Sequence, residues 1–157
     1  MQNRYFDYPD LASSRTVDDG SVELGLLAES DEADWSLLLD YGERRIAQRG
    51  EAIIERGSIG RALFIVLSGT CSVRGRGQRG SRTSVVRVLD AGDVVGEVGF
   101  AAGGPRSHTI TANVASEIFE LEWDSFERLA KAHPALGVRF LSDVLRIVAA
   151  RSRAAER

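Results

Sequence analysis

The stretch that decides the fold is residues 96–110, GEVGFAAGGPRSHTI. It follows a turn signal, DAGD at residues 90–93, and an apolar strand end at residues 94–95. The stretch cannot continue that strand, because it carries four glycines and then Pro105, which fixes φ and lacks a backbone N–H. Residues 98–102 are long enough for one short helical turn, and from Ile110 the sequence alternates back into a strand. The pattern therefore predicts a strand, a short helix, a loop and a second strand.

The charged and hydroxyl side chains of this stretch indicate an anion site beside a sugar site. Glu97 enters the short helix, and Arg106 leaves the loop just before Ser107 and Thr109. A guanidinium matches a phosphate because its fork donates two parallel hydrogen bonds, and a carboxylate accepts from sugar hydroxyls. The first N–H groups of a short helix add backbone donors. The pattern favours a phosphorylated sugar as ligand; the alternative is that Glu97 and Arg106 pair with each other across the loop.

The order of these residues resembles the phosphate-binding cassette of the cyclic nucleotide-binding domain family. That cassette has Gly-Glu, a short apolar helix, and then Pro-Arg followed by small or hydroxyl residues; here the matching parts are residues 96–97, 98–102 and 105–107. The resemblance implies that Glu97 holds the ribose 2′-hydroxyl, while Arg106, Ser107 and backbone N–H groups hold the cyclic phosphate. It extends over roughly residues 44–151, since GSIGRALFIVLSGTCSV at residues 57–73 also resembles the family's β-roll.

Two positions depart from the family's usual residues. His108 stands where a small residue is usual, and Gly99-Phe100 stands where Ala-Leu is common. The His108 side chain can either crowd the phosphate or point away from it. The expected ligand-binding residues are Gly96, Glu97, Val98, Arg106, Ser107, His108 and Thr109, with Gly96 and Val98 acting through the backbone.

Short segments with strand character follow one another from residue 44 to 114, each about five residues long and separated by glycines. This spacing is typical of a β-sandwich or barrel. The resemblance implies an eight-stranded antiparallel β-roll over residues 44–123, a jelly-roll-like double-stranded β-helix. In its last segment Phe119, Leu121 and Trp123 alternate with acidic residues, so we expect these three to face the core.

Helices are expected on both sides of the roll. Residues 1–20 keep no period and are interpreted as an extension, whereas residues 21–41 are helical in character, with Ser30 and Asp31 as capping residues. Two C-terminal helices are expected over residues 124–151, divided at His133-Pro134. The domain assignment is thus an extension (1–20) and one cyclic nucleotide-binding domain (21–157).

The final helix carries a wider apolar face than one packing seam requires. Phe140, Val144, Ile147 and Arg151 have coiled-coil spacing and can meet a second copy of the chain. The resemblance implies that this helix is the lid over the base and a dimer contact. The same periodicity is satisfied by a helix that folds back on its own domain.

Residues 74–82, RGRGQRGSR, alternate arginine and glycine. Such composition occurs in RNA-binding segments, but this one is short and has no aromatic residue for stacking. It also lies between two strands, which favours a solvated hairpin tip.

Composition excludes several classes of protein. A formal net charge of −3 over 157 residues argues against a general nucleic-acid binder. Cys71 is the only cysteine, so an internal disulfide is impossible. The N-terminus lacks the apolar core of a signal peptide, and no apolar run reaches the length of a membrane span. We therefore expect a cytoplasmic protein without nucleic-acid or membrane partners.

The resulting functional hypothesis is a non-enzymatic regulatory sensor of a cyclic nucleotide, with cAMP favoured over cGMP and an unknown protein as effector. The alternative is a degenerate copy of the fold that acts as a docking or dimerisation module without ligand. A metal-dependent enzyme on a cupin-like roll would need several histidines, and the chain has only His108 and His133. Transcription factors of this family carry a helix-turn-helix domain after the last helix, and no residues follow Arg157 to form one, so we do not expect DNA binding.

Overall fold

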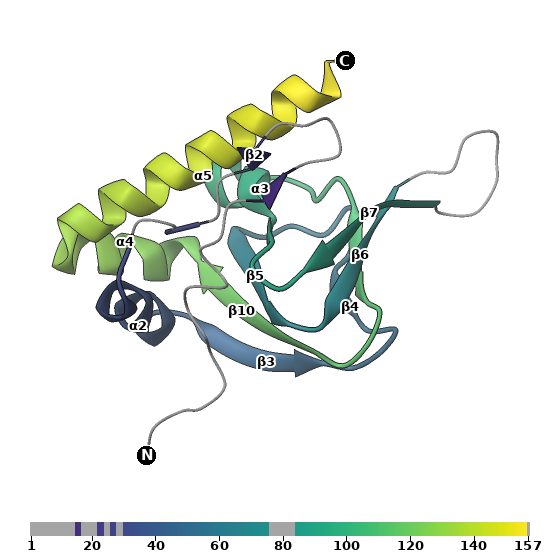
Figure 1. Cartoon of the computed structure of the whole chain (residues 1–157), viewed down its shortest axis with the longest axis horizontal. Helices are drawn as coiled ribbons and strands as arrows, with labels where there is room; N and C mark the ends of the chain where they lie inside the picture. The colour runs from purple at the N-terminus through teal and green to yellow at the C-terminus, as the bar shows by residue number, and fades with distance from the viewer. Residues whose placement is uncertain (1–14, 17–21, 24–25, 28–29, 76–83, 157) are drawn as a thin grey trace. The chain divides into compact units, whose positions relative to one another are not determined.

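The computed structural model describes residues 15–16, 22–23, 26–27, 30–75 and 84–156. The chain divides into two compact units, one from Glu43 to Trp123 and the other from the residues before and after it. The first is a β-roll and the second is mainly helical (Figure 1).

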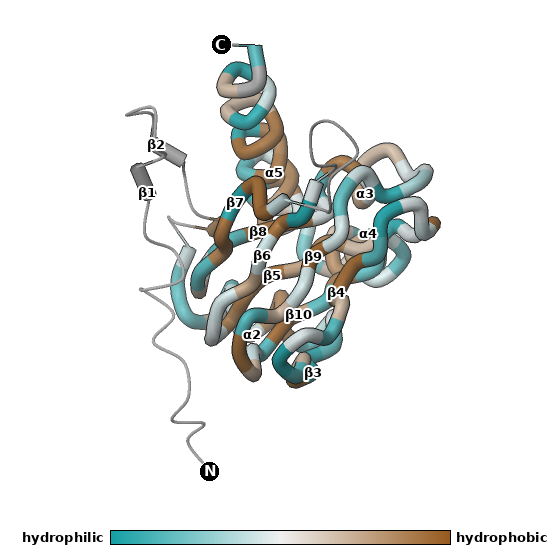
Figure 2. The backbone as a smooth tube through the Cα atoms, turned by 90° about the vertical axis from the view of Figure 1, so that its right-hand side faces the viewer, coloured by the Kyte–Doolittle hydropathy of each residue, from teal (hydrophilic) through white to brown (hydrophobic). Residues whose placement is uncertain are grey.

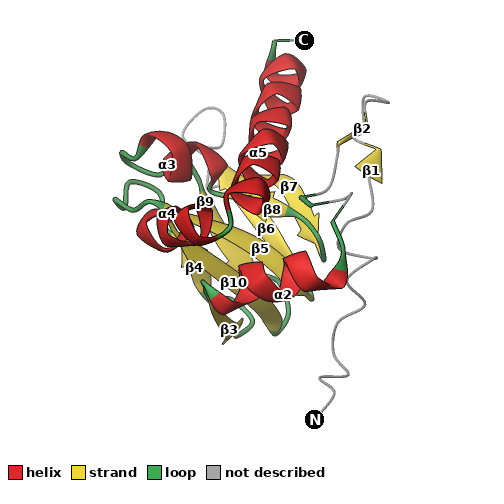
Figure 3. Ribbon diagram, turned by 90° about the vertical axis from the view of Figure 1, so that its left-hand side faces the viewer, coloured by secondary structure: helices red, strands yellow, loops and turns green. Residues whose placement is uncertain are grey.

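The roll consists of eight strands in two four-stranded sheets, drawn in yellow in Figure 3. All the strand pairs in both sheets are antiparallel, which confirms the expected eight-stranded antiparallel roll. The sheet orders are β3-β10-β5-β8 and β4-β9-β6-β7. The strands are β3 (Glu43–Ala47), β4 (Ala52–Ile54), β5 (Ala62–Ser68), β6 (Thr70–Gly75), β7 (Ser84–Asp90), β8 (Val94–Val95), β9 (Thr109–Ala112) and β10 (Ser116–Glu122).

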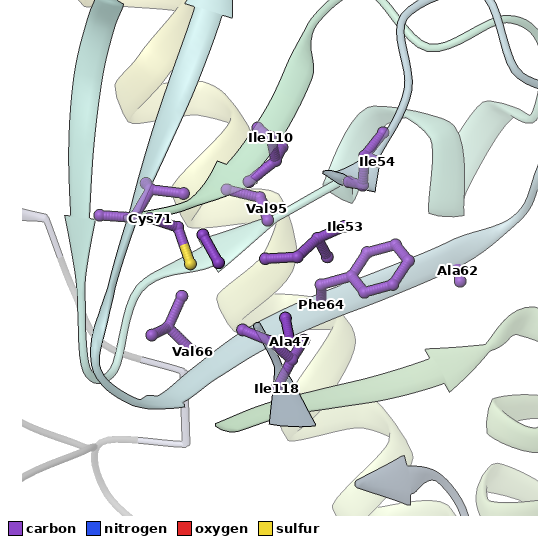
Figure 4. Close-up of a cluster of buried hydrophobic side chains, with 12 residues drawn as sticks. Ala47, Ile53, Ile54, Ala62, Phe64, Val66, Cys71, Val95, Ile110 and Ile118 are labelled. Carbon is purple, nitrogen blue, oxygen red and sulfur yellow. The ribbon is translucent and has the colours of Figure 1, made fainter. Parts of the chain in front are cut away.

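The interior of the roll is filled by small and branched apolar side chains from both sheets, which point into the space that the strands enclose (Figure 4). Figure 2 shows the matching hydrophobic stretches along the strands. Strand β5 is buried at six consecutive positions, 62–67, as expected for a central strand covered on both faces. The core cluster contains Ala47, Ile53, Ile54, Ala62, Phe64, Val66, Cys71, Leu89, Val95, Ile110, Ala112 and Ile118.

Strand β10 confirms that Phe119 and Leu121 are buried, whereas Trp123 is only partly buried, and it corrects which face of the strand lines the roll. The residue that β10 contributes to this core cluster is Ile118, whereas Phe119 and Leu121, although fully buried, lie on the opposite face of the strand. The reason is that β10 pairs with both β3 and β5 and is buried on both of its faces, so that apolar residues on either face fit. Glu120 therefore shares a face with Ile118.

The helical unit contains α2 (Glu32–Asp40), α4 (Trp123–Ala132) except for its first residue, which belongs to the roll unit, and α5 (Pro134–Ala155). Asp31 caps α2 by accepting a hydrogen bond from the Asp34 N–H at 2.9 Å, as its position in the sequence indicated. The prediction of helix from residue 21 onward is wrong at its start. A two-residue strand, β2 (Val22–Glu23), lies there instead and pairs with β1 (Arg15–Thr16).

Helix α5 is tied to the preceding segments of its own unit. Arg139 donates to Asp34 at 2.6 Å, and the carboxylate of Asp143 accepts from the Leu27 N–H at 2.9 Å. The break between α4 and α5 falls at His133-Pro134, with proline in the first turn of α5, as predicted.

Most of the apolar face of α5 is buried. Phe140, Val144 and Ile147, which the spacing offered for contact with a second copy, are between 0% and 4% exposed. Phe140 stacks on Phe126 of α4 with ring centroids 5.1 Å apart. Among the described side chains of α5, the large apolar ones that stay exposed are Val138, Leu141 and Leu145.

Two of the interpretations made from the sequence concern residues that are only partly described. The extension at residues 1–20 and the arginine–glycine tip lie outside the described residues, except for β1 and residues 74–75. Among the helices of the described residues, none is long and apolar enough to cross a membrane.

Candidate functional site

The short helix predicted within residues 96–110 is present as α3 (Glu97–Ala102). It begins directly after β8, where Gly96 has φ of 79°, and ends at Gly103, where φ is 70° and the N–H bonds the Gly99 carbonyl at 2.8 Å. Positive φ strains any residue with a Cβ, so the two glycines fix where the helix starts and stops. This local geometry is what the glycine pattern signalled.

The loop after α3 is fixed to the turn between β4 and β5. Pro105 forms an isolated bridge with Ile59. The Arg106 N–H donates to the Ser58 carbonyl at 2.9 Å, and the Gly57 N–H donates to the Arg106 carbonyl at 2.8 Å. The backbone of Arg106 is therefore held on both sides, which leaves only its side chain to be oriented.

The guanidinium of Arg106 turns inward, and the residue as a whole is only 9% exposed. Its Nη1 donates to the Gly96 carbonyl at 3.0 Å, and its Nη2 donates to the Ala62 carbonyl at 2.7 Å. These bonds use two of the five N–H donors of the fork. The centre of the guanidinium lies 5.8 Å from the Phe64 ring centroid.

Two glycines leave room for this guanidinium, and a third borders it. A Cβ on Gly99 would overlap Nη1, and a Cβ on Gly96 would come within 2.9 Å of Nη1. A Cβ on Gly60 would lie 3.6 Å from Nη2, in ordinary van der Waals contact. We call Gly60, Ala62, Phe64, Gly96 and Gly99 the Arg106 cradle.

Three carboxylates act on the charge of Arg106. Burial lowers the pKa of Arg106, and the negative charges of Glu122, Glu120 and Glu97 act in the opposite direction. Burial likewise raises the pKa of Glu120, assisted by Glu122 and Glu43 and opposed by Arg45 and Arg106. Because a guanidinium stays protonated in proteins, Arg106 remains a cation at this site.

Glu97 lies in the first turn of α3 and is buried, 9% exposed. Both hydrogen bonds that described residues make with the Arg106 guanidinium go to carbonyl oxygens, while Glu97 acts on Arg106 as a nearby charge. The hydrogen bonds of the Arg106 guanidinium therefore differ from the alternative in which Glu97 and Arg106 pair with each other.

The remaining predicted residues have differing surroundings. Ser107 and His108 are exposed, and the Ser107 hydroxyl lies 2.8 Å from Nδ1 of His108. The ring of His108 leans toward β6, since its Cδ2 would be 3.7 Å from a Cβ on Gly75. The Thr109 hydroxyl accepts from the Arg56 N–H at 3.1 Å, and the Val98 side chain is 62% exposed. The structure thus brings Gly96, Glu97 and Arg106 together and sets the other four around them.

One residue that contacts α3, Arg61, was not predicted from the sequence. Arg61, the residue just before β5, donates from Nε to the Phe100 carbonyl at 3.2 Å and from Nη2 to the Ala101 carbonyl at 3.0 Å. Its guanidinium also lies 4.2 Å from the ring centroid of Trp123. The available signal was a cation directly before a long apolar strand, and that signal does not say which backbone the cation meets.

The fold and this arrangement of residues define a class of protein. The family model of the cyclic nucleotide-binding domain matches residues 44–133. The match covers more than half of the chain and includes α3, the loop and Arg106. The chain belongs to the cyclic nucleotide-binding domain family.

Individual relatives agree with this assignment. The cAMP-dependent protein kinase regulatory subunit of Yarrowia lipolytica is 32% identical over 116 residues, which cover 73% of this chain and 30% of that protein. The Thermus thermophilus catabolite activator protein matches with a TM-score of 0.71 and 25% identity, over 81% of this chain and 57% of that one. A cyclic nucleotide-binding domain from Methylobacillus flagellatus KT shares the fold, with a TM-score of 0.72 at 24% identity, over 79% of this chain and 69% of that one. The chain spans less than a third of the first curated relatives that it matches.

Proposed function

We propose that this chain binds a cyclic nucleotide at residues 96–109 and acts as a non-enzymatic sensor module. The observation that supports the proposal most strongly is that the Arg106 guanidinium lies against the start of α3. A buried cation whose backbone is fixed at Ser58 and Gly57 lies against Gly96, next to the buried carboxylate Glu97. A pre-positioned cation beside a hydroxyl acceptor suits a phosphate ester of a sugar.

In this proposal each group has one role. Arg106 holds the cyclic phosphate through the N–H donors that its two carbonyl bonds leave over, and Glu97 accepts from the ribose 2′-hydroxyl. The hydroxyls of Ser107 and Thr109 and the backbone at Gly96 and Val98 supply further polar contacts. His108, next to Ser107, adjusts the affinity.

We favour cAMP over cGMP as the ligand. The support is the Yarrowia lipolytica relative, whose name describes it as cAMP-dependent. The signal would leave through α5, acting as a lid over the base, to a protein effector. Nucleotide binding would then shift the population of α5 positions.

A docking or dimerisation module without ligand is the second candidate. The observation that favours it is the exposed apolar set Val138, Leu141 and Leu145 on α5. Their spacing repeats on one helical side.

Thermal unfolding of the full chain with and without millimolar cAMP or cGMP tests the proposal, with Arg106→Ala as the matched variant. A nucleotide at a hundredfold over its Kd adds about 2.7 kcal/mol to the free energy of unfolding. For a chain of this size, that corresponds to roughly 5–10 °C in Tm. We expect this rise in the wild type and its loss in Arg106→Ala. No rise with either nucleotide would favour the docking module.

A further inference from the structure

We propose that Arg61 is a positioning residue for the nucleotide site, because it clamps the end of α3 opposite to Arg106 and ties that end to Trp123. The inference rests on the proposed function where it concerns ligand affinity. Its structural part, the clamp on α3, can be tested without any ligand.

Helix α3 cannot hold its place alone. It has six residues, and isolated helices much longer than this are only marginally stable in water. The last carbonyls of α3 need hydrogen-bond donors. The guanidinium of Arg61 supplies two donors, one to the Phe100 carbonyl and one to the Ala101 carbonyl. A cation at the C-terminal end of a helix is also favoured by the helix dipole. Arg61 therefore gives this short helix a defined end position.

The stem of Arg61 is part of the same contact. A Cβ on Gly103 would lie 3.6 Å from both Cγ and Cδ of Arg61, which places the stem along the backbone where α3 ends. The clamp thus combines hydrogen bonds from the guanidinium with packing of the methylenes.

Trp123 fixes Arg61 from the other side. The guanidinium stacks over the indole at 4.2 Å, and the Trp123 N–H donates to the Arg61 carbonyl at 2.8 Å. Phe100, fully buried in α3, meets the same indole edge-on with ring centroids 5.0 Å apart. Trp123 follows β10 directly and is the first residue of α4. Arg61 therefore joins α3 to the point where the chain leaves the roll.

The two arginines hold the two ends of one helix. Arg106 bonds the Gly96 carbonyl at the start of α3, and Arg61 bonds carbonyls at its end. Both also depend on the beginning of β5, since Arg106 bonds the carbonyl of Ala62, the residue after Arg61. If α3 loses its clamp at Arg61, Glu97 and the Gly96 and Gly99 backbone of the cradle lose their fixed positions relative to Arg106.

The test compares three variants of the full chain with the wild type. Arg61→Met keeps the stem but removes the guanidinium. Arg61→Lys keeps a cation over Trp123 but loses the fork that reaches two carbonyls. Arg49→Met, at an exposed arginine in the β3–β4 turn, is the control for loss of one positive charge. Hydrogen exchange of the α3 amides and binding of cAMP and of cGMP are measured for each.

We expect Arg61→Met to speed exchange of the α3 amides about tenfold and to weaken nucleotide binding by a similar factor. Tenfold is about the effect of losing one charged hydrogen bond at the low end of the usual range, as expected because one of the two Arg61 bonds is part-buried and the other is exposed. The amides of β5, β9 and β10 should keep their protection. Arg61→Lys should fall between the wild type and Arg61→Met, and Arg49→Met should match the wild type.

Unchanged α3 exchange in Arg61→Met would overturn the clamp. Faster exchange throughout the roll would also overturn it, because Arg61 would then stabilise the whole fold rather than α3. Faster α3 exchange with unchanged affinity would overturn the link to the nucleotide site. If the wild type binds neither nucleotide, the proposed function fails, and α3 exchange alone decides whether the clamp exists.

Discussion

The guanidinium of Arg106 occupies the space that a side chain at Gly99 would fill. Gly99 is in the middle of α3, where glycine is the least favourable residue except proline. Glycine at position 99 makes α3 less stable, but it leaves space for the buried guanidinium. This indicates that the placement of Arg106 matters more than the stability of α3. This relationship allows the cradle to be tested without a ligand.

Replacing Gly99 with alanine should therefore give different results in two backgrounds. With Arg106 present, Gly99→Ala should not raise Tm, because the new Cβ displaces the guanidinium. In the Arg106→Ala background the same change should add about 1 kcal/mol, the helix-propensity gain of alanine over glycine. Thermal or urea unfolding of the four proteins gives the coupling. Equal effects of Gly99→Ala in both backgrounds would contradict the cradle.

Arg106→Lys should bind the nucleotide about tenfold more weakly than the wild type. Lysine retains the charge, but it lacks the planar fork that can bond two carbonyls and still present donors to a phosphate. Calorimetric titration with cAMP and cGMP measures the change. An affinity equal to that of the wild type would mean that only the charge of Arg106 is needed.

Glu97→Gln should weaken binding less than Arg106→Ala does, because the partner of Glu97 in the proposal is a neutral hydroxyl. The role of Glu97 can be isolated with 2′-deoxy-cAMP, which lacks that hydroxyl. The wild type should bind cAMP more tightly than the 2′-deoxy analogue, and Glu97→Gln should discriminate less between the two. If the wild type and Glu97→Gln discriminate equally, the ribose contact belongs to another residue.

Glu120→Gln should stabilise the chain near neutral pH. Burial raises the pKa of Glu120 in the folded chain, and the nearby Glu122 and Glu43 add to this effect. The pKa of Glu120 is therefore higher in the folded chain than in the unfolded chain. The contribution of protonated Glu120 to the free energy of unfolding is fully present below its ordinary pKa of 4.5, and it is lost as the pH rises through the pKa of the folded chain. Ionised Glu120 therefore costs stability at pH 7, and the glutamine variant avoids that cost.

This prediction is checked by measuring Tm of both proteins from pH 4 to pH 8. The Tm of Glu120→Gln should exceed that of the wild type at pH 7, and the difference should shrink as the pH falls toward 4. A difference that is constant over this range would show that ionisation of Glu120 is not the cause.

Most of the roll could be predicted because its signals are local. Glycines and Pro105 mark where strands stop, and the short apolar segments between them form the strands of the roll within the expected region. The short helix expected at residues 98–102, found as α3 from Glu97 to Ala102, and the break at His133-Pro134 followed from the same kind of signal. The identities and order of Glu97 and Arg106 were enough to select them as candidates.

What the sequence could not give depends on contacts between distant residues. Ala62 accepts from Arg106 across 44 positions, and Arg61 reaches Ala101 across 40. Neither contact has a periodic or compositional signature. The sequence also could not predict which face of β10 lines the interior of the roll. Alternation separates the two faces of a strand, but when both faces are buried it does not say which of them is enclosed by the roll.

The most direct test of the account is a calorimetric titration of the full chain with cAMP and with cGMP, in the wild type and in Arg106→Ala. The account predicts saturable binding of at least one nucleotide, with cAMP favoured. It also predicts a loss of at least tenfold in Arg106→Ala, since hydrogen bonds to a charged group contribute about 1.5–3 kcal/mol each. Equal affinities of the wild type and Arg106→Ala, or no binding of either nucleotide by the wild type, would contradict it.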